Sequence, residues 1–335
     1  MRLRKTLLRI CSACWIAATL LLAGPALAEQ TAPQPEGETP PAMVIFCRVG
    51  DNDWRRVLDQ DASGVQTAGE PMTFAQVWRA DLHGQIPPNG PVERRAWNEL
   101  LLPLPETNIP CLGYALTYPS HQKEVSLEDS VTFPKHAAPQ ATRQDIIYRD
   151  HLDYEAEIGV LLHRNDRDRF GYLIVNDLTD RGIQVRTFDP DDMAPGFALA
   201  KSFEGALRIG PLLAIGNAAA WKTLEVDLYL NGELRQQLRA RECLLQPEAL
   251  VEHHLPVHTE APWLLVSTGT TEGVLFDVPD LWEKIEYFLR AGFSMKQAQE
   301  NWLAHLRFLQ PGDELTLVSS SLGRASARVV TGEIQ

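Results

Sequence analysis

The chain has 335 residues, of which 44% are hydrophobic and 22% are charged, and its formal net charge at pH 7 is −13. This is the composition of an ordinary globular protein with enough apolar side chains to form a core. Because the chain is acidic, it is poorly suited to bind nucleic acid or an anionic membrane surface, and neither partner is expected.

The N-terminus has the features of a secretory signal peptide. Basic residues within positions 2–9 precede an apolar run at 16–22, and Ala26-Leu27-Ala28 has the small-residue pattern of a cleavage site. The apolar run is too short to span a bilayer comfortably, which disfavours a membrane anchor. The sequence therefore predicts a signal peptide over residues 1–28 and an exported protein, periplasmic where there is an outer membrane, with no stable membrane anchor after cleavage.

The segment after the cleavage site, residues 29–42, is rich in Pro, Glu and Thr and lacks aromatic residues, which is typical of a disordered leader. From residue 43 the pattern becomes globular. "MVIFCRV" predicts a first strand, and "MTFAQVWRADL" favours a short helix or an irregular segment. We predict a small N-terminal subdomain over residues 43–110 and a main domain over residues 111–335.

Three cysteines remain after the predicted cleavage: Cys47, Cys111 and Cys243. They are an odd number and are not clustered, so the sequence predicts neither a disulfide framework nor a zinc site. One disulfide is possible in an oxidising compartment, and the sequence leaves open which pair would form it.

The main domain is predicted to consist mostly of strands. Residues 224–230 alternate apolar and polar side chains and lead into Asn231-Gly232, a hairpin turn signal followed by the return strand "ELRQQLRA". "APWLLVSTG", "DELTLVSS" and "RASARVV" favour further strands. A cluster of three histidines, His253, His254 and His258, has no other ligand type beside it and is predicted to lie on a solvated loop.

A helical insertion is predicted at about residues 279–309. Apolar residues recur at helical spacing from Leu281 to Leu289, and Ser294-x-x-Gln297 has the pattern of a capping box that begins a second helix. Because an apolar stripe needs a partner, we expect this pair of helices over the entrance of the site or at a dimer interface. A peripheral hairpin packed on its own subunit is an equal alternative.

Several common site motifs are missing from the sequence, namely GxSxG, HExxH, GxGxxG after a strand, and the P-loop. Acidic residues remain as candidates. In "LDYEAEIGVLL", residues 152–162, Glu155 and Glu157 share one face of a predicted strand. The apolar strand at 172–175 ends at Asn176-Asp177. Glu155, Glu157 and Asp177 would form an oxygen-rich site for Mg²⁺ or Mn²⁺. From spacing alone, a solvated acidic strand face is the more common explanation.

A resemblance to a known family is carried by seven blocks that occur in this order: "CLGYALTYPSHQKEV", "DYEAEIGVLL", "GYLIVNDLTDRGIQ", "LAKSFEGALRIGPLL", "VDLYLNGELRQ", "LVSTGT" and "FLQPGDELTLV". From about Cys111 to the C-terminus, the chain resembles the fumarylacetoacetate hydrolase family. The resemblance implies a β-rich α+β fold, a mixed β-roll of the C-terminal-domain type of that family, usually as a homodimer. It also implies that Glu155, Glu157 and Asp177 hold a divalent metal, usually Mg²⁺.

The resemblance also suggests roles for other residues. His121 and Glu124, in "SHQKE", are similar to a family dyad that closes over the site and activates a water. Lys201 matches a lysine that contacts substrate oxygens. Arg181 and Gln184 match a polar pair that grips the substrate's carboxylate or oxyanion, and both could equally be solvated turn residues. Thr270 matches a loop threonine that faces the metal, with an ordinary turn hydroxyl as the alternative.

The predicted function follows from these roles. It is metal-dependent hydrolysis of a C–C bond in a small 1,3-dicarbonyl or 2-oxo acid, such as an acylpyruvate. Decarboxylation or tautomerisation of an oxaloacetate-like acid is an alternative, and a periplasmic dicarboxylate-binding relative without activity is another. After "TGT" the family usually continues with Pro-Ala-Gly-Val-Gly, whereas this chain has "TEGVLFDVP" and the helical segment. The departure leaves the substrate open.

Overall fold

The computed structural model describes residues 42–83, 90–127, 129–258 and 260–332. The predicted signal peptide and all but the last residue of the predicted leader lie outside these ranges, so both stay predictions. A search of the described ranges finds no helix with the length and apolar character needed to cross a membrane.

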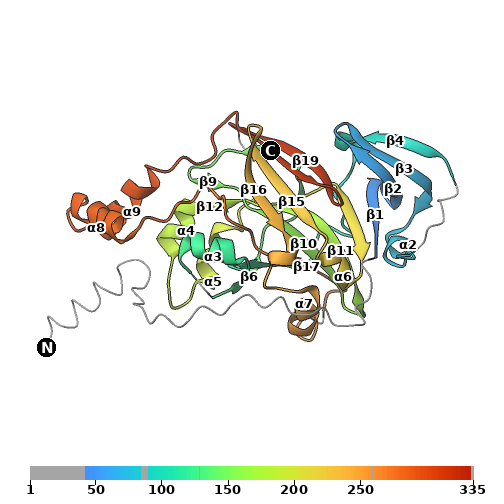
Figure 1. The fold of residues 1–335 in the computed structure, drawn as a ribbon, viewed down its shortest axis with the longest axis horizontal. Helices are drawn as coiled ribbons and strands as arrows, with labels where there is room; N and C mark the ends of the chain where they lie inside the picture. Colours follow the sequence, from blue (N-terminus) through green and yellow to red (C-terminus); the bar gives the residue numbers. More distant parts are fainter. Residues whose placement is uncertain (1–41, 84–89, 128, 259, 333–335) are drawn as a thin grey trace, which may run out of the picture.

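Two sheets form the body of the molecule (Figure 1). The larger has twelve strands, and its main path runs β4 (Val92–Ala96), β3 (Gly64–Met72), β2 (Asp53–Asp61), β1 (Met43–Gly50), β14 (Leu212–Gly216), β11 (Asp166–Asp177), β10 (Ala156–His163), β17 (Trp263–Ser267), β5 (Cys111–Ala115) and β6 (Val131–Lys135). β13 (Leu207–Ile209) pairs with β11 and with β7 (Gln140–Ala141). The second sheet has the order β16 (Glu233–Arg239), β15 (Glu225–Leu230), β18 (Glu314–Ser319), β19 (Gly323–Val330) and β8 (Ile146–Ile147). A separate short pair joins β12 (Thr179–Asp180) to β9 (Leu152–Asp153).

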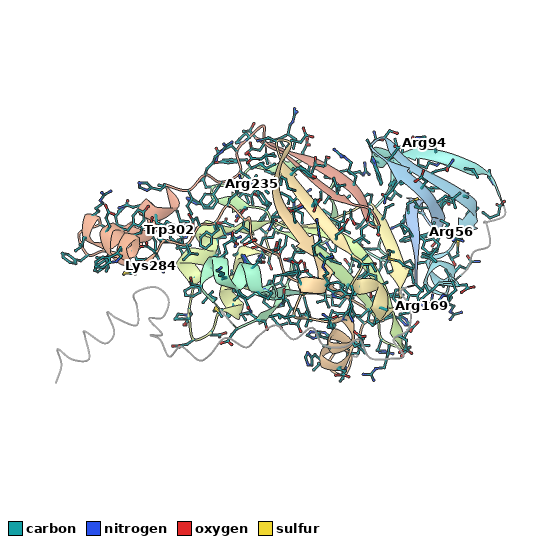
Figure 2. All side chains as sticks on the ribbon, in the orientation of Figure 1. Arg56, Arg94, Arg169, Arg235, Lys284 and Trp302 are labelled. Carbon is teal, nitrogen blue, oxygen red and sulfur yellow. The ribbon has the colours of Figure 1, made fainter. Side chains whose placement is uncertain are left out.

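Short helices connect and cover these sheets. They are α2 (Phe74–Trp78), α3 (Pro119–Val125), α4 (Arg181–Thr187), α5 (Ala194–Ala200), α6 (Ala218–Trp221), α7 (Pro247–His254), α8 (Leu281–Arg290) and α9 (Met295–Leu303), with single 3₁₀ turns η1 (Trp97–Glu99) and η2 (Ala240–Glu242). Figure 2 shows Arg56 and Arg94 on the N-terminal strands at one end of the molecule, and Lys284 and Trp302 on the helical hairpin at the other.

The predicted first strand is present, and of the two alternatives for the segment near residue 74, the short helix forms. β1 pairs with β14, with Met43 opposite Gly216, so the N-terminal strands extend the large sheet. The helix α2 begins at a capping box in which Thr73 and Gln76 satisfy each other's backbone N–H groups. The division of the chain at residue 110 stays a prediction.

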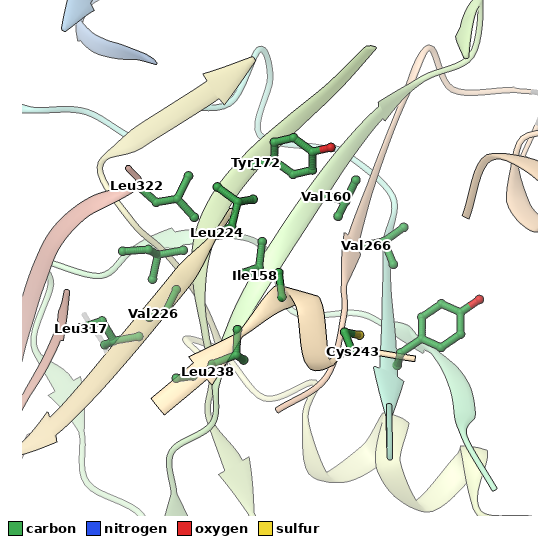
Figure 3. Close-up of a cluster of buried hydrophobic side chains, with 14 of the residues drawn as sticks. Ile158, Val160, Tyr172, Leu224, Val226, Leu238, Cys243, Val266, Leu317 and Leu322 are labelled. Atoms are coloured by element: carbon green, nitrogen blue, oxygen red, sulfur yellow. The ribbon is translucent and has the colours of Figure 1, made fainter. Parts of the chain in front are cut away.

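The main core lies between the two sheets (Figure 3). Ile158 and Val160 of β10 pack against apolar side chains of β15 and β16, among them Val226 and Leu238. The alternation predicted for residues 224–230 is confirmed, because the even-numbered side chains of β15 are buried and the odd-numbered ones are half-buried. The apolar face of each strand therefore holds the two sheets together.

The structure also places the cysteines and two residues of the histidine cluster. The three cysteines are buried free thiols, so no disulfide forms among them. The solvated loop predicted for the histidines is wrong for His253 and His254, which lie on α7. His254 is buried, and its Nε2 is 2.6 Å from the hydroxyl of Tyr114. Burial, with the two neighbouring imidazoles, lowers the pKa of His254 to about 4.

Two helices form within the segment predicted to be helical. Asp280 caps the start of α8 and Ser294 caps the start of α9, each through its side-chain oxygen. α9 packs against α4, whereas α8 projects from the body and exposes 77% of Trp282. The pair lies at one end of the molecule (Figure 1). That it is an insertion in the family pattern stays a prediction.

Candidate active site

The pairing of β10 with β11 brings three acids together. Glu157 lies opposite Val175, and the backbone N–H of Asp177 donates to the carbonyl of Glu155 over 2.9 Å. Glu155 and Asp177 are thus direct neighbours across the strands, and Glu157 is diagonal to Asp177. One carboxylate oxygen from each of the three acids lies within 4.8 Å of the others.

All three carboxylates are buried. Glu155 is 5% exposed, and Glu157 and Asp177 are 0% exposed. The solvated strand face, which spacing alone favours, is therefore wrong. A buried group of like charges requires compensation by cations or protons.

Three basic side chains supply part of that compensation. Lys201, at the end of α5, donates to Glu155, to Asp177 over 3.1 Å and to the Thr179 hydroxyl over 2.8 Å. Lys135, the last residue of β6, forms a buried ion pair with the other oxygen of Asp177.

Arg181 is the third cation, and it is placed by the start of α4. The Asp180 side chain caps this helix by accepting from the backbone N–H of Ile183 over 2.9 Å. Arg181 is therefore the first helical residue, and its Nη2 lies 2.7 Å from both Glu155 and Asp153. Counting Asp153, four carboxylates face three cations, so the cluster lacks one positive charge or one proton.

The surroundings shift the pKa values of Glu155 and Glu157 in opposite directions. Burial alone raises the pKa of Glu155, but the charges of Lys201 and Arg181 outweigh it and lower the pKa to about 2. Burial, followed by repulsion from Asp177, raises the pKa of Glu157 to about 8. In the absence of a metal, Glu157 is therefore the group that holds the missing proton.

The donor set fits a hard divalent cation. Glu157 Oε2 accepts from the Ser267 hydroxyl and from the Gly269 N–H, the latter over 3.0 Å. Its other oxygen, Oε1, is buried without a hydrogen-bond partner. A carboxylate oxygen without a hydrogen-bond partner is available as a ligand, and two further carboxylates lie beside it. Such a set of oxygen ligands suits Mg²⁺ or Mn²⁺.

The predicted His121–Glu124 dyad is formed on α3, with the two residues one helical turn apart. His121 Nδ1 lies 2.8 Å from Glu124 Oε2, and Glu124 Oε1 accepts from the Gly273 N–H over 2.9 Å. Gly273 has a φ of +98°, and a Cβ there would lie 2.0 Å from the carbonyl oxygen of Arg235. Only glycine therefore allows the backbone to approach Glu124 in this way.

A cavity of about 310 Å³ lies beside these groups. His121 and Glu155 both line it, together with Arg181, Gln184 and Thr270. Its size is in the range of small-molecule sites, about 300–1,000 Å³. The arrangement can therefore present a metal-ligating carboxylate and a histidine to the same small molecule.

These observations agree with a comparison to known families. The model of the fumarylacetoacetate (FAA) hydrolase C-terminal domain matches residues 111–330. The chain belongs to the fumarylacetoacetate hydrolase family. The expected β-rich α+β fold of this family is confirmed.

Similar proteins of the family are distant. An uncharacterized protein of Staphylococcus epidermidis is 26% identical over 236 residues, which is 65% of this chain and 67% of that protein. A 2-hydroxyhepta-2,4-diene-1,7-dioate isomerase from Mycobacterium marinum has a TM-score of 0.55 at 16% identity and covers 88% of this chain and 100% of its own. A maleylpyruvate hydrolase from Sphingobium sp. SYK-6 has a TM-score of 0.50 at 16% identity and covers 86% and 100%. At these identities, the structural likeness shows the shared fold.

The structure brings the predicted site residues of this family member together. Arg181 Nη1 donates to Gln184 over 2.8 Å, so this pair lies side by side at the cavity. The Thr270 hydroxyl donates to the Ala156 carbonyl over 2.8 Å. Lys201 is fully buried among the acids and is not one of the described residues that line the cavity. Its predicted contact with substrate stays a prediction.

Sequence reasoning missed Lys135, Asp153 and Ser267 as parts of this site. A signal for Lys135 was available, because β6 alternates and places Phe133 and Lys135 on its buried face. A lysine at an inward-facing strand position requires a buried acid as partner. No comparable local signal marks Ser267.

Proposed function

We propose that this protein is a divalent-metal-dependent hydrolase that cleaves a C–C bond in a 2-oxo acid or 1,3-dicarbonyl compound of the acylpyruvate type. The observation that carries the proposal is that the same cavity is lined by both His121, of the dyad, and Glu155, of the acidic triad. A fold neighbour with the name maleylpyruvate hydrolase supports hydrolysis as the reaction class.

Glu155, Glu157 and Asp177 would hold the metal. When bound, Mg²⁺ or Mn²⁺ supplies a Lewis acid that withdraws charge from the oxo-acid oxygens. Four carboxylates and three cations leave the cluster one negative charge, and a divalent cation changes this to one positive charge. The loaded site therefore favours an anionic substrate.

The dyad provides the base. Glu124 engages Nδ1 of His121, so Nε2 is the ring nitrogen free to take a proton from water. The water oxygen forms a bond to the acyl carbon while the proton passes to Nε2. The bond between that carbon and the oxo-acid fragment then breaks, and its electron pair leaves with the fragment, which takes up a proton. Gln184 and Arg181 line the cavity where they can contact substrate oxygens.

The surroundings of Lys201 support a role besides its predicted contact with substrate oxygens. Its ammonium group is surrounded by Glu155, Asp177 and Thr179, and these acids raise its pKa although burial alone would lower it. We therefore assign to Lys201 a role in balancing the acidic cluster, with stabilisation of the substrate oxyanion as a second role to be tested.

Decarboxylation or tautomerisation of an oxaloacetate-like acid is the second candidate. It needs the same withdrawal of charge from oxo-acid oxygens but no attacking water. The fold neighbour that is named an isomerase favours retaining it. A dicarboxylate-binding protein without activity is less well supported, because such a protein does not need the hydrogen-bonded His121–Glu124 pair.

The test begins with protein that has been stripped of metal and reloaded with Mg²⁺ or Mn²⁺. Acetylpyruvate and oxaloacetate are supplied to each sample, and pyruvate release and acetate release are measured. Metal-dependent release of acetate from acetylpyruvate, abolished in His121→Ala, is expected. Turnover of oxaloacetate alone would favour the second candidate, and no turnover of either acid would contradict enzymatic function of this type.

Export and self-association are further proposals. The order of basic, apolar and small residues before position 29 supports export to the periplasm. The exposed apolar side of the helical hairpin, with Trp282 at 77% and Phe293 at 70% exposure, supports an association surface and a homodimer. Light scattering after size-exclusion chromatography tests the oligomeric state.

A further inference from the structure

Most of the cavity lining differs in chemistry from the acids and the dyad. It comes from α4, α5, α9 and the segments next to them and is largely apolar, with Val185, Phe188, Phe197, Phe276, Met295 and Trp302, and it includes the amide of Gln299. A small oxo-acid head bound near Glu155 would leave much of this lining uncovered, so the cavity has room for a larger acyl group.

Few of the lining residues are ionisable. Among the described residues that line the cavity, the ionisable side chains are His121, Glu155 and Arg181, of the dyad and the acidic cluster. Arg181 is held at the acidic cluster, where it would contact the oxo-acid head, because it binds Asp153 and Glu155 and lies over the Phe276 ring at 4.9 Å. The described lining therefore offers no cation to a second carboxylate at the far end of a substrate.

The apolar wall is held in place by its own contacts. Trp302 is 4% exposed, its ring lies 5.0 Å from Phe276, and its indole N–H donates to the Asp277 carbonyl over 3.1 Å. Phe197 stacks on Phe133 at 5.5 Å. Figure 2 shows Trp302 on the side of the hairpin that faces the body of the molecule. The wall is preformed, so its shape can select a ligand.

We infer that the substrate is a 2-oxo acid whose acyl group ends in an apolar chain or ring, and that Trp302, Met295 and Phe188 select it against acids that end in a second carboxylate. This inference rests on the proposed function for the binding of the oxo-acid head. Burial of an apolar tail here is favourable, whereas an ionised carboxylate would lie among apolar side chains with no cation and, from α9, only the Gln299 amide as a polar neighbour. It also gives the helical hairpin a role, because α9 supplies Met295 and Trp302.

Binding to the complete protein, loaded with Mn²⁺, tests the selectivity without any need for turnover. The probes are pyruvate, 2-oxooctanoate and its dioate counterpart of equal chain length, each titrated by calorimetry. We expect 2-oxooctanoate to bind at least about tenfold more tightly than either of the others. Equal or tighter binding of the dioate would overturn the inference.

Variants of the wall connect the preference to named residues. Trp302→Ala should remove most of the advantage of 2-oxooctanoate and leave the affinity for pyruvate unchanged. Phe188→Ala, in a half-buried position, gives the same test if the loss of Trp302 disturbs folding. Met295→Lys should strengthen binding of the dioate at least about tenfold relative to the matched neutral variant Met295→Gln. Unchanged affinities in all of these variants would show that this wall does not select the tail.

The two proposals can fail separately. Hydrolysis of acetylpyruvate, whose acyl group is too small to reach the apolar wall, depends on the proposed function alone. If acetylpyruvate is cleaved and the dioate binds as well as 2-oxooctanoate, the selectivity is wrong and the reaction stands. If no acylpyruvate is cleaved but the affinity order holds, the reaction is wrong and the apolar subsite stands.

Discussion

In metal-free protein, Glu157→Gln is expected to stabilise the fold at neutral pH and to weaken metal binding. The wild-type side chain is fully buried beside Asp177, and its pKa is raised from 4.5 to about 8. Because the folded state holds this proton more tightly than the unfolded state, stability is lost as the pH rises from 4.5 to about 8. Glutamine has nearly the shape of the protonated acid and is not subject to this loss.

The size of the expected change in the free energy of unfolding follows from the pKa shift of Glu157. At pH 7 the unfolded side chain has released its proton and the folded one has not, so the difference of roughly 2.5 pH units from 4.5 corresponds to about 3 kcal/mol at most. At about pH 4 the acid is protonated in both states, and the advantage of glutamine should vanish. Urea unfolding of metal-free protein at both pH values measures the difference.

Glu155→Gln is the matched control, because the groups around Glu155 shift its pKa in the opposite direction from that of Glu157. Lys201 and Arg181 outweigh the effect of burial and lower the pKa of Glu155 from 4.5 to about 2. Ionisation of this side chain therefore stabilises the fold above pH 4.5, and this stability is lost as the pH falls to about 2. Replacement by glutamine should cost up to about 3 kcal/mol at pH 7.

Metal addition completes the test. At a Mg²⁺ or Mn²⁺ concentration of about a hundred times Kd, wild-type protein should gain about 3 kcal/mol, and neither glutamine variant should gain as much. Wild-type affinity should increase as the pH rises to about 8, because Glu157 must lose its proton before it binds the ion. The reasoning is refuted if Glu157→Gln destabilises metal-free protein at pH 7, or if it binds the ions as tightly as wild type.

Four further predictions concern other parts of the chain. His121→Ala should keep metal affinity, measured by calorimetry, and lose hydrolysis at least about a hundredfold, while any decarboxylation survives. Gly273→Ala should clash with the Arg235 carbonyl and lower both the melting temperature and hydrolysis, and an unchanged rate would show that the backbone contact to Glu124 is dispensable. Deletion of residues 280–307 should alter the kinetics or the oligomeric state, and the functional role of the hairpin is wrong if neither changes. Mass spectrometry of periplasmic protein should find a mature N-terminus near residue 29, and an intact Met1 would exclude cleavage.

Much of the secondary structure could be predicted because it depends on neighbours in the sequence. The alternation in residues 224–230 and the Asn231-Gly232 turn predict the hairpin of β15 and β16, which forms as expected. Ser294 and the helical spacing of apolar residues predict α9. The acidic triad could be proposed as well, but only through the resemblance of whole blocks to a family, since spacing alone favoured a solvated face.

Burial and charge pairing were decided by the tertiary structure. Whether Glu157 is solvated or buried depends on strands that are distant in the sequence, since its hydrogen-bond partner Ser267 is 110 positions away. Lys135 pairs with Asp177 from 42 positions away; α5 packs against β6, and Lys201 at the end of α5 pairs with the same carboxylate. Local patterns encode helices, strands and turns, whereas the dielectric around a carboxylate and the pairing of charges arise from packing between distant segments. For the same reason, the apolar lining of the cavity, to which the packed helices α4 and α9 both contribute, could not be predicted from either helix alone.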